Sequence, residues 1–150
     1  MKILIIHRTK NDDVGKFVTN LKVNLETKGN IVDLFSRNED LHMPSLSSSM
    51  EGLKDFVKKK DLENKYDLIY TQDWSIAFPL LFPSKIAYEK HYSLFHNVQE
   101  DGNPGSKILS KIAANMLGSH LFVRNQNLKG IFSKSALSED GMKILDLAKD

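Results

Sequence analysis

The chain has 150 residues, with 21 lysines and arginines against 19 acids, a formal net charge of +2 and no cysteine. The length suits a single domain, and so small a net charge argues against nucleic acid as a partner. Without cysteine, disulfides and thiol chemistry are excluded. No apolar run approaches the roughly 18 residues of a membrane span or resembles a signal peptide, so we expect a cytoplasmic protein.

The first third of the chain predicts a strand, a helix and a second strand. Residues 2–6 (KILII) form a continuous apolar run, which is typical of a strand buried on both faces. Caps at residues 11–13 precede apolar residues at helical spacing over 14–25, and Gly29 ends this helix. Residues 31–35 (IVDLF) are the second strand. This unit implies a right-handed parallel crossover.

The middle of the chain continues the alternation. After a loop over 36–49, Ser48 and Glu51 predict a capping box at the start of a second helix. A strand over 67–70 follows, and then a short helix over 75–82 that stops at Pro83.

The last third predicts two more strands and up to three helices. Residues 91–95 form the fourth strand, and Asn103 caps a helix whose first residue is Pro104 and whose end is Gly118. The remaining elements are a strand over 121–123, a short helix over 126–133 and a helix capped by Ser138 that runs to Lys149. Five strands alternating with helices predict a Rossmann-like three-layer α/β sandwich with a mostly parallel sheet.

The common short motifs are absent. The chain has neither GxxxxGK[ST] nor GxGxxG after the first strand, so a dinucleotide, flavin or phosphate loop is not expected there. It has no HExxH, no CxxC and no GxSxG. We therefore expect no cofactor and no metal.

Polar residues follow three of the predicted strands. His7 and Arg8 follow the first strand, residues 72–74 (QDW) the third, and His96 the fourth. Because parallel strands end at the same edge of a sheet, where ligands bind, these side chains are expected to converge on one cleft.

Four segments share a pattern with a known family. Residues 14–18 (VGKFV) open the first helix, and residues 28–32 (KGNIV) lead into the second strand. Residues 66–74 (YDLIYTQDW) and 94–97 (LFHN) contain the ends of the third and fourth strands. In order and spacing these segments resemble the N-terminal domain of retaining GT-B glycosyltransferases of family 4, over roughly residues 1–135.

The resemblance implies one half of a GT-B fold, the half that binds the acceptor. Its expected function is transfer of a hexose from a nucleotide-sugar to a glycan or lipid acceptor with retention of anomeric configuration. In that family a second domain carries the nucleotide-sugar and the acidic pair that grips it. We expect that domain to come from a partner chain or from sequence beyond residue 150, and this chain to be inactive without it.

Two positions depart from the family pattern. The glycine pair of the first loop is reduced to Gly15, and Gln72 stands where the family usually has a histidine. A glutamine does not titrate near neutrality, so that position offers no acid or base.

The resemblance also implies roles for residues at the strand ends. His96 is the expected catalytic residue, in contact with the transferred sugar; the alternative is a partly buried histidine bonded to a loop carbonyl. Asp73 either accepts a hydrogen bond from an acceptor hydroxyl or caps the next helix. Trp74 either stacks on a sugar ring or belongs to the core.

The remaining candidates are substrate-binding residues. Gly15, with the first amides of its helix, either binds an anionic group or permits close helix–strand packing. His7 and Arg8 would meet a phosphate-bearing substrate, although Arg8 is also free to be a surface residue. Asn97 either contacts the acceptor or belongs to a mobile loop. Arg124 follows the fifth strand, and only its position marks it.

Two alternatives complete the interpretation. The run Lys58–Lys59–Lys60 is either the solvated face of a helix or a weak peripheral contact with the inner face of an anionic membrane. The domain itself is either a transferase half or a non-catalytic α/β module that binds carbohydrate or a phosphorylated ligand. Of these possibilities, only a module that binds a phosphorylated ligand predicts nucleotide binding by this chain alone.

Overall fold

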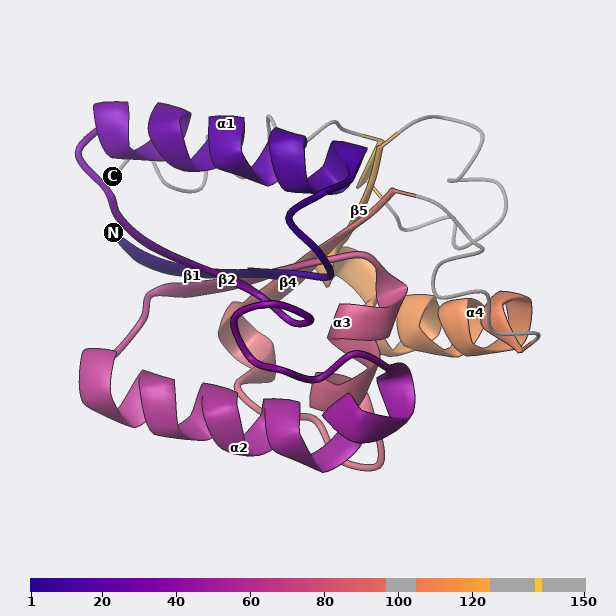
Figure 1. The fold of residues 1–150 in the computed structure, drawn as a ribbon. Coiled ribbons are helices and arrows are strands. Elements are labelled where there is room, and N and C mark those ends of the chain that lie inside the picture. The colour runs from indigo at the N-terminus through magenta and orange to yellow at the C-terminus, as the bar shows by residue number, and fades with distance from the viewer. Residues whose placement is uncertain (97–104, 125–136, 139–150) are drawn as a thin grey trace.

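The computed structural model describes residues 1–96, 105–124 and 137–138, which form one six-stranded sheet covered by helices (Figure 1). Strands and helices alternate along the chain. In chain order they are β1 (Lys2–His7), α1 (Asp13–Thr27), β2 (Ile31–Ser36), α2 (Leu46–Asn64), β3 (Leu68–Gln72), α3 (Trp74–Leu81), the 3-10 helix η1 (Tyr88–Lys90), β4 (His91–Phe95), α4 (Ser106–Leu117), the 3-10 helix η3 (Gly118–His120), β5 (Leu121–Val123) and β6 (Leu137–Ser138).

The sheet has the strand order β2-β1-β3-β4-β5-β6, and each of these neighbouring pairs is parallel. In register, Ile5 of β1 lies between Leu34 of β2 and Tyr70 of β3. The order reverses between β1 and β3, and in open sheets of this kind ligands bind beyond the carboxyl ends of the strands. The predicted Rossmann-like three-layer α/β fold with a parallel sheet is confirmed.

The helices cover the two faces unequally. Of the described helices, α1 covers one face of the sheet, and α2, α3 and α4 lie on the other, where α3 contacts both of its neighbours (Figure 1). Val18, Leu21 and Leu25 of α1 pack on Ile3 and Ile5 of β1, as their helical spacing predicts. The described helices cover the two faces of the sheet. Its carboxyl edge is bordered by the loops and the helix N-termini that follow the strands.

The predicted start of α2 is wrong by about one turn. The helix begins at Leu46, and Ser45 is its N-cap in place of Ser48. The Ser45 hydroxyl accepts a hydrogen bond from the backbone N–H of Ser48 (3.1 Å), and the Ser48 hydroxyl accepts one from the backbone N–H of Ser45 (3.2 Å). A serine thus takes the part that Glu51 was expected to play in the reciprocal cap.

Two predictions for the end of the chain are also wrong. Helix α4 begins at Ser106 with Gly105 as its N-cap, later than predicted, and Asn103 and Pro104 lie outside the described residues. A sixth strand, β6, was not predicted; it contains Ser138, and the helix that Ser138 is expected to cap lies outside the described residues. The predicted helices over 126–133 and 139–149 lie outside the described residues.

Candidate functional site

His96 directly follows β4 and is held by groups at the ends of β3 and β5. Its backbone N–H donates a hydrogen bond to the Asp73 carboxylate oxygen Oδ1 (2.9 Å). The backbone N–H of Arg124 donates to the carbonyl of Phe95, the residue before His96 (3.1 Å). Three strand ends are therefore tied together at His96, which gives its imidazole a defined position.

Both ring nitrogens of His96 are hydrogen-bonded within the protein. Nδ1 lies 3.0 Å from Arg124 Nη1, and Nε2 lies 2.8 Å from Gln72 Oε1. A guanidinium only donates, so Nδ1 accepts and the ring proton sits on Nε2, which donates to the amide oxygen of Gln72. Arg124 thus determines the tautomer of His96, and the amide orientation of Gln72 follows from it.

The surroundings of His96 favour its neutral form. Burial lowers the pKa of its imidazole to about 3, and the nearby guanidinium charge of Arg124 is the second cause. A neutral imidazole with its proton on Nε2 has one nitrogen lone pair, on Nδ1. That lone pair is occupied by Arg124, so His96 serves as a base only if Arg124 moves away.

A groove of about 560 Å³, here called the His96 groove, lies between α1 and the ends of β4 and β5. The edge of the Phe17 ring approaches the imidazole with 5.2 Å between ring centroids at 76°. The guanidinium carbon of Arg124 lies 4.6 Å from the centre of the same Phe17 ring. The residues that line the groove are Asp13, Val14, Lys16, Phe17, Asn20, His96 and Arg124.

The start of α1 is held rigidly beside this groove. Asp12 is the N-cap, and its Oδ1 accepts a hydrogen bond from the backbone N–H of Gly15 (2.8 Å). A Cβ at Gly15 would lie 2.6 Å from the carbonyl oxygen of Lys10 and 2.8 Å from that of Thr9. Glycine is therefore needed for close contact between the helix and the preceding loop, whereas the predicted contact was with a strand. Arg8 pairs with Asp12 (3.2 Å).

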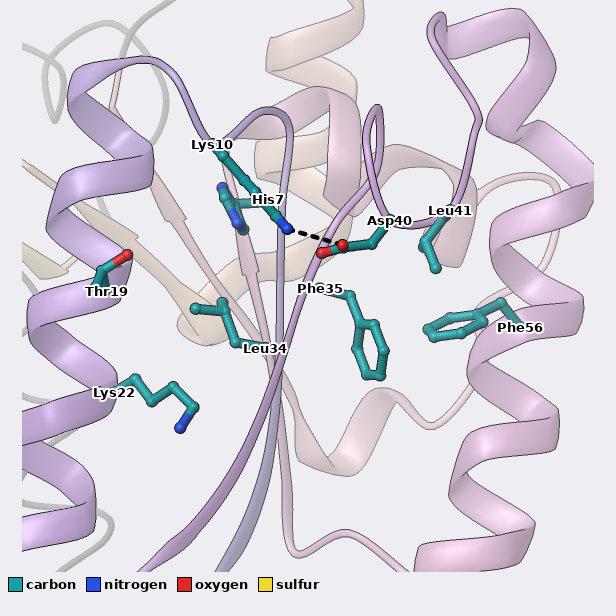
Figure 2. Close-up of a pocket in the computed structure, with 9 residues that line it drawn as sticks. All are labelled: His7, Lys10, Thr19, Lys22, Leu34, Phe35, Asp40, Leu41 and Phe56. Carbon is teal, nitrogen blue, oxygen red and sulfur yellow. Dashed lines mark ion pairs between the residues drawn. The ribbon is translucent and has the colours of Figure 1, made fainter.

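His7 lies in a different cavity, of about 620 Å³, here called the His7 cavity (Figure 2). Figure 2 shows Lys10 extending to Asp40, with 2.9 Å between Nζ and Oδ1. Leu34 lies on the α1 side of β2, and Phe35 lies on the α2 side together with Phe56 (Figure 2). The nine residues that line this cavity do not include His96. Among the cavities given by the described residues, His7 and His96 therefore line different ones.

Asp73 and Trp74 are both buried, so the structure offers neither to a ligand. Asp73 occupies the N-cap position of α3 without a side-chain capping hydrogen bond, and its carboxylate accepts the backbone N–H of His96 instead. Trp74 is fully buried among Phe95, Leu117 and other apolar side chains of α3, α4 and β5. Its indole is part of the core, which corrects the interpretation of Trp74 as a wall for a sugar ring.

Sequence reasoning gave no role to four residues that line the groove or contact the imidazole of His96, although it noted two of them. Gln72 was noted only as a departure from the family, yet it accepts the hydrogen bond from His96. Lys16 and Asn20 lie four residues apart on α1, which places them on one side of the helix. That spacing could have indicated that both side chains lie on the same side of α1. The apolar positions of the helix already show which side faces the sheet. Arg124 was marked only by its place after β5, and Asn97 lies outside the described residues.

The described part of the chain contains no group of three or more potential metal-ligating side chains. None of its helices is long and apolar enough to cross a bilayer. Within the lysine run, Lys58 and Lys59 are exposed, while Lys60 lies over the ring of Phe35 with 5.2 Å between Nζ and the centroid. Peripheral membrane contact through this run stays a prediction.

Comparisons of the chain with protein-family models, with curated proteins and with solved structures find no match. Any assignment of function therefore depends on the geometry of the His96 groove together with the resemblance of the four segments.

Proposed function

We propose that this domain is the acceptor-binding half of a retaining hexosyltransferase and acts with a donor-binding domain. The observation that carries the proposal is the position of His96 in a groove beside the start of α1, at the carboxyl edge of a parallel sheet. The resemblance implies a histidine at this place, and open α/β sheets bind ligands at this edge.

The groove supports recognition of a small polar acceptor. Its volume of about 560 Å³ is within the usual range of roughly 300–1,000 Å³ for ligand pockets. Asn20 and Lys16 offer hydrogen-bond donors, and the Phe17 ring offers an apolar surface. A hydroxyl of the acceptor held here would face the second domain, which presents the nucleotide-sugar.

The chemistry required of this half is positioning. The acceptor hydroxyl attacks the anomeric carbon as the bond to the departing nucleoside diphosphate breaks, and its proton passes to that leaving group. A neutral His96 orients the hydroxyl by accepting its hydrogen bond at Nδ1, and it adds no positive charge beside an oxocarbenium-like transition state. Catalysis by such an arrangement needs a rigid His96, which the links to Asp73 and Gln72 supply.

A second candidate, a carbohydrate-binding module without chemistry, is favoured by one observation. Both ring nitrogens of His96 are engaged inside the protein, so the imidazole has no site open to a substrate until Arg124 moves. Such a module would keep the groove and bind sugars with no turnover.

The two candidates are separated by an assay for transfer. The full chain is mixed with donor-binding domains of GT-B enzymes, nucleotide-hexoses and hydroxyl acceptors, and new glycosidic products are sought by mass spectrometry. We expect product with the wild-type chain and about a 100-fold loss with His96→Ala, in line with the roughly 10²-fold cost of misplacing a reacting group. His42→Asn, a change at an exposed histidine outside the groove, is the matched control. Sugar binding without product in every pairing would favour the module.

A further inference from the structure

Two cations that line the His96 groove have no anionic partner in the described part of the chain. Among the described residues, no carboxylate lies within 4.0 Å of the charged nitrogens of Lys16 or Arg124. Other cations near this edge are neutralised: Arg8 pairs with Asp12, and Lys10 pairs with Asp40. Asp13 also lines the groove, and it pairs with neither Lys16 nor Arg124.

The contacts of Arg124 leave most of its hydrogen-bonding capacity unused. Its side chain is exposed and its guanidinium lies over Phe17; toward the described residues, only Nη1 makes a hydrogen bond, to a neutral imidazole nitrogen. A guanidinium has five N–H donors in a planar fork that matches two oxygens of a phosphate. Charge-assisted hydrogen bonds of that kind are roughly twice as strong as neutral ones. An anion entering the groove would therefore compete well with His96 for Arg124.

We propose that the acceptor bound in the His96 groove carries a phosphomonoester, and that Arg124 leaves Nδ1 of His96 to bind it. Lys16 contributes the second positive charge, and Asn20, one turn further along α1, faces the sugar portion of the ligand. This inference rests on the proposed function and names the class of acceptor. It also accounts for the contact between Arg124 and Nδ1. Only a phosphorylated acceptor draws Arg124 away, and the lone pair of Nδ1 then accepts the hydrogen bond of the acceptor hydroxyl.

The primary test is a nuclear magnetic resonance titration of the full chain labelled with ¹⁵N-histidine. The probes are inorganic phosphate, glucose 6-phosphate, unphosphorylated glucose and uridine diphosphate. We expect glucose 6-phosphate to bind at least about tenfold more tightly than glucose and to move the ¹⁵N resonance of His96 Nδ1, because a hydroxyl donor replaces the charged guanidinium of Arg124. Equal affinity for the two sugars, or an unmoved resonance at saturation, would overturn the inference. So would preferential binding of uridine diphosphate, since the groove would then hold the donor.

Variants assign the effect to the named cations. Arg124→Gln and Lys16→Gln are each expected to weaken the binding of glucose 6-phosphate about 10- to 100-fold, and to weaken the binding of glucose by less than that. Lys22→Gln, on the same helix but paired with Glu26 and outside the His96 groove, is the matched control and should bind normally. Circular dichroism verifies that each variant is folded, and Arg124→Lys retains the charge if Arg124→Gln does not fold. Wild-type affinity in Arg124→Gln would contradict the inference.

Two further measurements identify the source of the phosphate and separate this inference from the proposed function. Cosedimentation with phosphatidylcholine vesicles containing phosphatidic acid tests a lipid phosphate, and glucose 6-phosphate tests a soluble one; Arg124-dependent binding in either supports the shared chemistry. Absence of Arg124-dependent binding in both assays would overturn the inference that the groove binds a phosphomonoester. Arg124-dependent phosphate binding without sugar transfer, with any donor-binding domain, would contradict only the transferase proposal. Sugar transfer to neutral acceptors that is unaffected by Arg124→Gln would contradict only the phosphate proposal.

Discussion

The carboxylate of Asp73 holds the backbone N–H of His96, and it does so from a strained backbone. The hydrogen bond measures 2.9 Å, and Asp73 has φ 74° and ψ 163°, a region that is essentially restricted to glycine. Strain of this kind costs about 1–3 kcal/mol and persists where the surrounding structure over-determines it. The link between β3 and β4 is therefore maintained against a local cost at the point where His96 is positioned.

This strain predicts an unusual order of stabilities at position 73. Asp73→Ala loses a charged hydrogen bond worth about 1.5–3 kcal/mol and keeps a side chain that disfavours this conformation. Asp73→Gly loses the same bond but relieves the strain, so its free energy of unfolding should exceed that of Asp73→Ala by about 1–3 kcal/mol. Urea denaturation measures both values. A glycine variant no more stable than the alanine variant would contradict the strain at this residue.

Two glycines inside helices, Gly15 of α1 and Gly52 of α2, should respond differently to alanine. Gly15→Ala drives a Cβ to 2.6 Å from the carbonyl oxygen of Lys10, which belongs to the backbone and must shift. We expect destabilisation of about 1–3 kcal/mol, as in other overpacked sites. At Gly52 of α2 the nearest atom is the flexible end of Met43 at 2.8 Å, so Gly52→Ala should be neutral or gain up to about 1 kcal/mol of helix propensity. Thermal or urea unfolding of the pair tests this, and equal effects would be inconsistent with the tight contact at Gly15.

Stability should fall in mild acid because of a buried histidine. Burial, with a smaller contribution from His120, lowers the pKa of His91 to about 3, while an unfolded histidine titrates near 6.5. The unfolded chain therefore binds more protons between these values, and stability is lost as the pH falls below about 6.5. Between pH 7 and pH 5 this linkage amounts to about 2 kcal/mol for His91. His91→Asn should flatten the dependence of the unfolding free energy on pH by that amount, and an unchanged slope would refute the assignment.

Gln72 controls His96 through a single acceptor atom. Gln72→Leu leaves the Nε2–H of His96 without its partner and should destabilise the fold by about 1–3 kcal/mol. Gln72→Glu keeps an acceptor but places an anion beside the imidazole, so the pKa of His96 should rise by at least about one unit. Histidine resonances followed against pH report the second effect, and denaturation reports the first. If the pKa of His96 is the same in Gln72→Glu as in the wild type, the hydrogen bond from Nε2 is not present.

The sequence predicted the alternation of strands and helices because apolar spacing along each element reflects burial directly. Helix starts were less predictable, since the side chain of Ser48 takes the capping role that a glutamate was expected to fill. The short β6 gave no periodic signal at all.

The candidate site was only partly predictable, for a physical reason. The carboxyl ends of β1 and β4 lie at the same edge of the sheet, but among the cavities given by the described residues His7 and His96 line different ones. Which side chains share a cavity depends on the α1 start and on the packing of Phe17 against His96. Such contacts join residues far apart in the chain, so spacing along the sequence does not reveal them.

The burial of Trp74 has a practical consequence. It is the chain's one tryptophan, it adjoins the residue that holds His96, and it packs against Leu117 of α4. Indole fluorescence shifts to longer wavelengths when water reaches the ring, so the emission spectrum reports whether α3 and α4 stay packed together. The chain thus contains an intrinsic optical reporter one residue from Asp73, and no dye or fusion is required to follow loosening at that position.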